Sequence, residues 1–329
     1  MSLSLRELLS IQNLEISLKN PLNDQRGKVL RGVSLQLDEG QRVALVGESG
    51  CGKSMTALSI LNLLPQPPME VTGGSIRFKD KDIQTLTKKD WENIRGKEIG
   101  IVFQEPMTSL NPVFTVGLQI EETLQKHLFF SKDEAKQKAL ILLSDVGLPD
   151  PERVMDQYPH QLSGGMCQRA MIAMAVACGP SLLIADEPTT ALDVTVQAQI
   201  LDLVFKLTQQ HKMTMLLITH DLRIVKGHTD RVVILYAGEV MEEGTPSEIF
   251  EHARHPYTEG LLASMPQFEQ RGRDLASIGG VVPSPFEDLT ACAFADRCPK
   301  VQDKCRREKP DFVVNKTGHG VRCFYPSEK

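Results

Sequence analysis

The sequence predicts an α/β protein built on a mostly parallel β-sheet, and two patterns lead to this prediction. Short apolar runs bounded by polar or turn residues are typical of strands buried on both faces of a sheet, and they occur at residues 41–46, 182–185, 215–219 and 232–236. The first run continues into a glycine-rich turn and then a helical stretch at 54–63, which ends before a cluster of prolines. A strand, a tight turn and a helix in this order form the start of a parallel α/β unit.

The segment at about residues 95–170 has a different pattern, which is typical of helices. Ser131 and Glu134 have the spacing of a capping box, in which the hydroxyl accepts from the backbone N–H of Glu134 and the carboxylate reaches back. Apolar residues then recur at helical spacing until Gly147 and Pro149 end the run. The segment therefore predicts a helical insert within the α/β core.

Composition and charge narrow the class of protein. Of 329 residues, 41% are apolar and 24% are charged, which is typical of a folded globular chain. The formal net charge is −5, so the chain as a whole lacks the basic surface that most nucleic-acid-binding proteins carry.

Two features indicate a chain that neither enters nor crosses a membrane. Arg6 and Glu7 stand where a signal peptide would need its apolar stretch. The most apolar run, residues 171–178, is far shorter than the roughly 20 residues that a spanning helix needs. We therefore expect a cytosolic protein whose thiols are kept reduced.

The glycine-rich turn matches the phosphate-loop pattern G-x-x-x-x-G-K-[ST] over residues 47–54. Glycines allow backbone N–H groups to surround phosphates, and the following helix directs its positive end toward them. The pattern assigns Lys53 to the β- and γ-phosphates and the Ser54 hydroxyl to Mg²⁺. The predicted nucleotide-binding residues here are Gly47, Glu48, Ser49, Gly50, Cys51, Gly52, Lys53, Ser54 and Met55.

An acidic pair, Asp186 and Glu187, follows the apolar run at 182–185. Ligands bind at the carboxyl ends of parallel strands, so Asp186 is placed to hold Mg²⁺ and Glu187 to polarise an attacking water. Such a pair can also be a helix cap with a surface carboxylate. The phosphate loop about 130 residues upstream favours the catalytic interpretation.

Four further motifs resemble those of ABC ATPases and occur in that family's order. Leu162, Ser163, Gly164 and Gly165 resemble the signature, and Gln104 resembles the Q-loop residue. Residues 191–193, ending in Asp193, are similar to the D-loop, and His220 is similar to the switch histidine. In isolation, the signature serine would be simply a helix cap and the histidine a structural residue; their order and spacing carry the resemblance.

The resemblance implies a P-loop NTPase of ABC type, with a mostly parallel sheet core, an antiparallel β subdomain and a helical subdomain. It implies a nucleotide-binding domain at 1–250, with the helical subdomain at about 95–170, and a small loop-rich, cysteine-containing extension at 251–329. In this family Gln104 senses the γ-phosphate or the metal, His220 contacts the γ-phosphate, and Ser163, Gly164, Gly165 and Asp193 complete the pocket of a partner subunit. MgATP is then bound between two chains.

Residues 104–112, 158–166 and 254–262 resemble, within ABC ATPases, the importers of oligopeptides, dipeptides and nickel, and most closely the dipeptide-permease branch. The resemblance implies a peripheral protein on the cytoplasmic face of the inner membrane. Its partners would be a second, related ATPase, two permease subunits and an external solute-binding protein. The cargo stays open between peptides, nickel and another small solute. The rival classes, ABC ATPases of DNA maintenance and of translation, call for a DNA-binding insert or a second cassette, and the sequence shows neither.

Four of the seven cysteines, Cys292, Cys298, Cys305 and Cys323, lie in the tail with gaps of 5, 6 and 17 residues. Structural zinc sites usually have tighter C-x₂₋₄-C pairs, whereas four thiolates on loops can hold a [4Fe–4S] cluster. The family resemblance supports an iron–sulfur cluster, with zinc and free thiols as alternatives.

The chain departs from the family pattern where adenine is bound. Family members usually stack the base on an aromatic side chain in the first strand region, but Leu18 stands there, and the first aromatic residue of the chain is Phe78. A stack on an aromatic ring contributes about 1–3 kcal/mol per base. We therefore expect weaker nucleotide binding or looser base selectivity.

Overall fold

The computed structural model describes residues 6–190, 192–265 and 277–327, and the chain forms two compact units. The first unit comprises Met1–Asp38, Arg42–Gln84 and Ile218–Lys329, and the second comprises Glu39–Gln41 and Thr85–Leu217. One strand, β8 (Thr214–Thr219), begins in the second unit and ends in the first.

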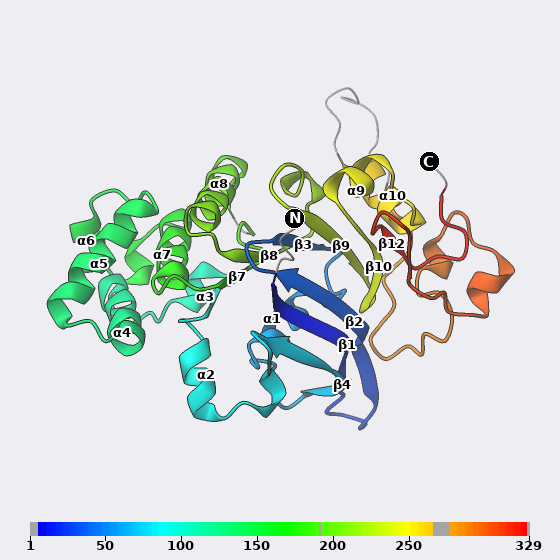
Figure 1. Ribbon diagram of the computed structural model, residues 1–329, viewed down its shortest axis with the longest axis horizontal. Helices are drawn as coiled ribbons and strands as arrows, with labels where there is room; N and C mark the ends of the chain where they lie inside the picture. Colours follow the sequence, from blue (N-terminus) through cyan, green and yellow to red (C-terminus); the bar gives the residue numbers. More distant parts are fainter. Residues whose placement is uncertain (1–5, 191, 266–276, 328–329) are drawn as a thin grey trace. The chain divides into compact units, whose positions relative to one another are not determined.

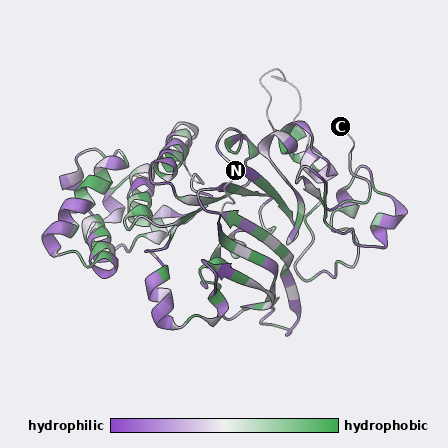
Figure 2. Ribbon diagram, in the orientation of Figure 1, coloured by the Kyte–Doolittle hydropathy of each residue, from purple (hydrophilic) through white to green (hydrophobic). Residues whose placement is uncertain are grey.

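The first unit contains a four-stranded antiparallel sheet with the order β2-β1-β4-β5 (Figure 1). Its strands are β1 (Glu7–Lys19), β2 (Arg26–Asp38), β4 (Met69–Phe78) and β5 (Lys81–Asp82). Leu14, Ile16 and Leu30 are fully buried, whereas Asn13 and Lys28 on the same strands are exposed. The ribbons of these strands are accordingly banded in hydrophobic and hydrophilic colours (Figure 2). A sheet with one buried face and one solvated face has this alternation.

The second sheet of this unit is organised around a parallel pair. Its strands are β3 (Arg42–Val46), β9 (Arg231–Tyr236), β10 (Glu239–Gly244), β11 (Val313–Val314) and β12 (Gly320–Val321). β3 and β9 are parallel, with Leu45 opposite Val233, and β10 continues the sheet antiparallel to β9. The tail then adds β12 to the free side of β10. Residues from the tail thus extend the sheet that contains the strand before the phosphate loop.

The remaining elements of the first unit are helices and short 3₁₀ turns. Among the described residues, they are α1 (Lys53–Ile60), η1 (Ile83–Thr85, at the unit boundary), η3 (Leu222–Ile224), α9 (Pro246–Glu251), α10 (Pro256–Ala263), η5 (Ala295–Arg297) and η6 (Asp303–Arg306). Thr245 and Glu248 form a complete capping box at the start of α9.

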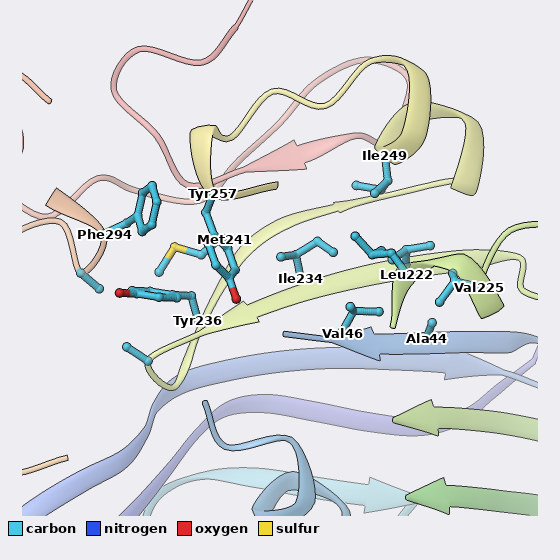
Figure 3. Close-up of a cluster of buried hydrophobic side chains, with 13 residues drawn as sticks. Ala44, Val46, Leu222, Val225, Ile234, Tyr236, Met241, Ile249, Tyr257 and Phe294 are labelled. Carbon is cyan, nitrogen blue, oxygen red and sulfur yellow. The ribbon is translucent and has the colours of Figure 1, made fainter. Parts of the chain in front are cut away.

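One apolar cluster joins β3, β9, β10, α9, α10 and the tail (Figure 3). Figure 3 shows the rings of Tyr236, Tyr257 and Phe294 gathered around Met241 at one end of the cluster. These three rings are almost entirely buried. Because burying one aromatic side chain contributes on the order of 2 kcal/mol, the tail is firmly packed onto the sheet at this end.

The second unit combines a parallel strand pair with a group of helices (Figure 1). The strands β6 (Ile99–Val102) and β7 (Leu182–Asp186) are parallel, with Ile101 opposite Ile184. The helices and turns are α2 (Lys88–Ile94), α3 (Pro106–Ser109), α4 (Val116–Leu128), α5 (Lys132–Asp145), α6 (Pro151–Met155), η2 (Pro159–Gln161), α7 (Gly164–Val176) and α8 (Val194–Gln210). Helices α4, α5 and α7 pack against one another.

The structure confirms the four predicted strands, with every limit within one residue of the prediction. The capping box at Ser131 and Glu134 is formed, with the Glu134 carboxylate 2.8 Å from the Ser131 backbone nitrogen. Helix α1 is shorter than the predicted 54–63: it ends at Ile60, because Asn62 adopts the left-handed conformation before the prolines are reached. Within the part of the chain that the structure describes, no helix is long and apolar enough to cross a bilayer.

Candidate active site

The phosphate loop lies between β3 and α1 in the first unit. A Cβ atom on Gly47 would lie 2.2 Å from the backbone oxygen of Leu235, so only glycine fits beside β9. Gly52 has φ 104° directly before the helix begins, in the left-handed region that favours glycine. Between them, Ser49 and Gly50 are exposed at the tip of the loop. The loop therefore leaves its tip accessible to a ligand.

Lys53 closes the loop from the first turn of α1. The side chain is buried, and its ammonium donates to the carbonyl oxygens of Gly47 at 2.9 Å and Glu48 at 3.0 Å. Ser54 and Met55 follow it, half-buried, in the same turn. A buried ammonium at a helix N-terminus supplies the positive charge that a polyphosphate needs. The loop cysteine, Cys51, is fully buried, and this burial raises the pKa of its thiol despite the nearby Lys53.

The carboxylate of Glu48 contacts the C-terminal part of the chain. Both of its oxygens accept from the Arg297 guanidinium, at 2.6 and 2.9 Å. The backbone N–H of Glu48 donates to the Tyr257 hydroxyl at 3.1 Å. These two contacts join residues 249 and 209 positions apart in the sequence. Neither Arg297 nor Tyr257 is among the site residues that the sequence predicts.

His220 follows β8 and belongs to the first unit. The side chain is exposed and lines a pocket of about 210 Å³ together with Asp221, Arg223 and residues of α10 and its end. The Asp221 carboxylate is partly buried, which raises its pKa, but hydrogen bonds from Arg223 and its positive charge lower the pKa more, so that the net shift is downward. An ionised carboxylate therefore stands next to His220.

In the second unit, Asp186 ends β7 and Glu187 follows it. Asp186 is buried, with 6% of its surface exposed. Glu187 has φ 44°, in the left-handed region that non-glycine residues rarely adopt and that often marks functional sites. One oxygen of its carboxylate accepts from Gln104 at 3.4 Å and from Thr190 at 3.1 Å. The structure thus brings together the predicted general base and the predicted Q-loop glutamine.

The signature and D-loop residues lie at the starts of two neighbouring helices. Ser163 caps α7 by accepting from the backbone N–H of Met166 at 3.3 Å, and Asp193 caps α8 in the same way. The Cβ position of Gly165 lies 3.2 Å from Val196 of α8. Side chains larger than glycine would therefore disturb the contact between the two helix starts. Gly164 is the first residue of α7; Ala191, which we assigned to the D-loop, lies outside the described residues.

The four tail cysteines line one small cavity of about 10 Å³, together with Phe294, Lys300 and other tail residues. Burial, followed by the neighbouring thiols of Cys305, Cys323 and Cys298, raises the pKa of Cys292 to about 11. Cysteine sulfurs are soft donors of the kind that iron–sulfur and zinc sites use. In the described residues, no group of three or more His, Cys, Asp or Glu side chains is close enough to hold a single metal ion.

Comparisons with known proteins identify the family of the chain. Residues 30–190 match the family model of the ABC transporter, and residues 241–305 match that of the oligopeptide/dipeptide transporter C-terminal region. The chain is 50% identical to the oligopeptide transport ATP-binding protein AppD of Bacillus subtilis, over 91% of each chain. The chain belongs to the ABC transporter ATP-binding proteins of the oligopeptide/dipeptide type. Its reaction is ATP hydrolysis.

Other relatives support the same family. The dipeptide transport ATP-binding protein DppD of Bacillus subtilis is 46% identical over 99% of this chain and 96% of its own length. A dimeric bacterial ABC transporter cassette of known structure is 30% identical, with a TM-score of 0.64 over 73% of this chain and 99% of that one. The ABC fold predicted from the sequence, with its parallel core, antiparallel sheet and helical region, is confirmed. Membership of the family also implies permease subunits as partners.

Proposed function

We propose that this ATPase powers an importer that takes up peptides through separate permease subunits. The observation that supports it most is the match to oligopeptide and dipeptide transport ATP-binding proteins over about nine-tenths of the chain and of each relative, including the C-terminal region. Nickel or another small solute is the second candidate. The test is ATP hydrolysis by the reconstituted transporter with a panel of solutes delivered by the binding protein. Stimulation by di- or oligopeptides supports the proposal, and stimulation by nickel complexes alone overturns it.

In the proposed mechanism, residues 47–55 hold the nucleotide. The backbone N–H groups of the loop surround the phosphates, and the buried Lys53 exchanges its bonds to loop carbonyls for the β- and γ-phosphates. Ser54, Gln104 and Asp186 are the proposed Mg²⁺ ligands, since a buried carboxylate at a strand end and a hydroxyl in the first helical turn are oxygen donors suited to this ion. Bound Mg²⁺ would neutralise charge that develops on the phosphates.

Hydrolysis is assigned to three side chains. Glu187 orients and deprotonates the attacking water, and its hydrogen bonds from Gln104 and Thr190 fix the direction of the carboxylate. Gln104 senses the γ-phosphate or the metal and passes this state to the permease. His220 donates to the γ-phosphate, with the ionised Asp221 beside it. Catalysis of this kind consists mainly of positioning and charge stabilisation.

Ser163, Gly164, Gly165 and Asp193 are proposed to complete the nucleotide pocket of a partner ATPase, which is a second, related chain. Helix starts at α7 and α8 present backbone N–H groups that suit an anion. ATP would then join the two chains. To shift the ratio of closed to open pairs from 1:99 to 99:1, ATP must bind the closed pair more tightly than the open pair by about 5.5 kcal/mol. Turnover that depends on the second ATPase supports this assignment, and full turnover by a strictly monomeric preparation contradicts it.

We further propose a nucleotide-binding domain at residues 1–250, whose helical subdomain occupies about 95–170, and a C-terminal extension at 251–329. The assembly would lie on the cytoplasmic face of the inner membrane and would receive solute from an external binding protein through the permease. Copurification with integral membrane proteins supports this location. Copurification with nucleic acid or ribosomes would favour the non-transport classes of ABC ATPase.

The cavity lined by Cys292, Cys298, Cys305 and Cys323 is proposed to hold a [4Fe–4S] cluster, with zinc as the alternative metal. Four thiolate ligands leave no open coordination position, so the group would stabilise the tail, not act on substrate. Anaerobic purification followed by iron and sulfide analysis and absorption spectroscopy tests this. About four irons per chain support a cluster, whereas one zinc per chain or metal-free protein overturns it.

A further inference from the structure

Arg297, in the four-cysteine tail, contacts the phosphate loop with a guanidinium whose hydrogen-bonding capacity is fully used. Arg297 donates twice to the Glu48 carboxylate, at 2.6 and 2.9 Å, and also to the Tyr236 hydroxyl at 3.3 Å. Its other bonds go to the backbone oxygens of Ile278 at 3.1 Å and Gly279 at 2.9 Å. A guanidinium has five N–H donors in a planar fork, and these five contacts use that number. The side chain is therefore held in one orientation.

The surroundings of this contact make it a strong one. The Arg297 side chain is only 5% exposed and that of Glu48 is 27% exposed. The guanidinium also lies 5.5 Å from the ring centre of Tyr236 and 5.9 Å from that of Phe294. Bidentate, partly buried arginine–carboxylate pairs are stronger than exposed ion pairs, because solvent screens them less.

The charge of Glu48 makes the pair relevant to nucleotide binding. A carboxylate within a loop that binds phosphates repels the ligand, and this repulsion is greatest where the charge is shielded from water. Arg297 neutralises that charge and holds the carboxylate toward the tail. The Tyr257 hydroxyl fixes the backbone of the same residue at its N–H group. Two groups from distant parts of the chain thus fix one loop residue.

The same contact is continuous with the four-cysteine cavity. Arg297 directly precedes Cys298, and Phe294, which packs edge-on against Tyr236 at 5.3 Å, lines the cavity. The Tyr236 and Tyr257 rings also contact each other, at 4.7 Å between centres. A change in the backbone around Cys298 therefore acts on the guanidinium that holds the phosphate loop.

We propose that Arg297 is a positioning residue of the ATP site: it neutralises and orients Glu48, and through this contact the four-cysteine tail sets the affinity of the phosphate loop for nucleotide. The inference rests on the proposed assignment of residues 47–55 to ATP. It predicts that Arg297→Gln weakens ATP binding and raises KM, while kcat stays within about twofold, because Glu187 and its contacts are untouched.

The experiment measures the Kd for MgATP and the steady-state kinetics of the full chain within its assembled transporter. Arg297→Gln should raise the Kd about tenfold, the effect expected for one lost charged hydrogen-bonding pair. The penalty should shrink as ionic strength rises, because it arises from an uncompensated charge. Arg297→Lys keeps the positive charge but loses the planar guanidinium that bonds both carboxylate oxygens. It should therefore raise the Kd less than Arg297→Gln does.

The decisive variant is Glu48→Gln combined with Arg297→Gln. Removing both charges should restore the Kd to within about threefold of the wild-type value, because no unpaired carboxylate then faces the phosphates. A purely structural role of Arg297 predicts no such rescue. If the double variant binds as weakly as Arg297→Gln, or if Arg297→Gln binds like wild type, the proposal is wrong.

The chain provides a matched control in Arg322. It also directly precedes a tail cysteine, Cys323, and it donates to the backbone oxygens of Val240 at 3.0 Å and Pro310 at 3.2 Å, neither of which belongs to the phosphate loop. Arg322→Gln should lower the thermal stability of the tail as Arg297→Gln does, yet leave the Kd for MgATP within about twofold of wild type. Equal increases in Kd for both variants would show a general effect of tail damage and overturn the proposal. A wild-type chain that fails to bind MgATP would instead overturn the proposed function.

Discussion

The two groups of candidate site residues are held in place in different ways. In the first unit, the phosphate loop is fixed by residues distant in sequence: Tyr257 and Arg297 hold Glu48 from 209 and 249 positions away. In the second unit, near neighbours hold several site residues, as when Thr190 donates to Glu187 and Asp193 accepts from the N–H of Val196. The contact from Gln104 to Glu187 spans 83 positions. Nucleotide affinity should therefore respond to changes in the tail, and the rate of hydrolysis should respond to local changes in the second unit.

The largest expected effect is a loss of hydrolysis without a loss of ATP binding. Glu187→Gln removes the proposed general base but keeps the size of the side chain, so turnover should fall by roughly 10²–10⁴-fold while ATP still binds. Phosphate release and nucleotide binding by the same preparation check this. The control is Asp202→Asn, an exposed carboxylate on α8 of the same unit, which should hydrolyse ATP at the wild-type rate. Near-normal turnover of the Glu187 variant would remove this residue from the role.

The second expected effect is a weakening of ATP binding when the four-cysteine tail is damaged. Cys305→Ser removes one proposed ligand from the four-cysteine cavity, so bound iron should be lost and the tail should unfold at lower temperature. Through Arg297, the Kd for ATP should rise as well. Iron analysis, thermal unfolding and ATP binding are measured together. Cys178→Ser, a half-buried cysteine outside the tail, is the control; equal iron content in both variants would contradict the assignment.

The third prediction concerns a substitution that should increase the affinity for ATP. Leu18 lies on β1, half-buried, where the family resemblance predicts an aromatic partner for adenine. Leu18→Tyr should tighten ATP binding about tenfold, in the range of one base–ring stack, and should increase the preference for ATP over GTP. Competition binding of the two nucleotides measures this. A strong preference for one base in the wild-type chain would show that adenine is already held by other groups.

The smallest expected effect isolates one hydrogen bond. Tyr257→Phe removes the hydroxyl that accepts from the Glu48 N–H, and the Kd for ATP should rise about fivefold. The matched control lies next to it: the buried Thr258 hydroxyl makes no hydrogen bond within the described residues, so Thr258→Val should change little. If both variants bind ATP equally, the tyrosine does not position the loop.

Much of the core could be predicted from the sequence, because its patterns are local. The strand before the phosphate loop and the strand before Asp186 are short, continuous apolar runs, and the capping box at Ser131 needs only four consecutive residues. The antiparallel sheet came only from the family resemblance. Register shifts along β1, at several places between Glu7 and Ser17, interrupt the strict alternation that identifies a strand with one buried face.

The tail and its contact with the loop could not be predicted in the same way. β11 and β12 have two residues each, too few to give a pattern. Nothing in the composition indicates which of many arginines pairs with Glu48, because an ion pair across 249 positions depends on the tertiary fold. The motif at 254–262 identified the family, but the hydrogen bond from Glu48 to Tyr257 became visible only in three dimensions.

The most direct test of this account measures two variants side by side. For Arg297→Gln and Glu187→Gln, the Kd for MgATP and kcat are determined in the assembled transporter. The account predicts opposite patterns: weaker binding with kcat within about twofold of wild type for the arginine variant, and retained binding with strongly reduced kcat for the glutamate variant. If the arginine variant loses turnover at saturating ATP while its Kd stays at the wild-type value, the tail does not support the phosphate loop and the account is contradicted.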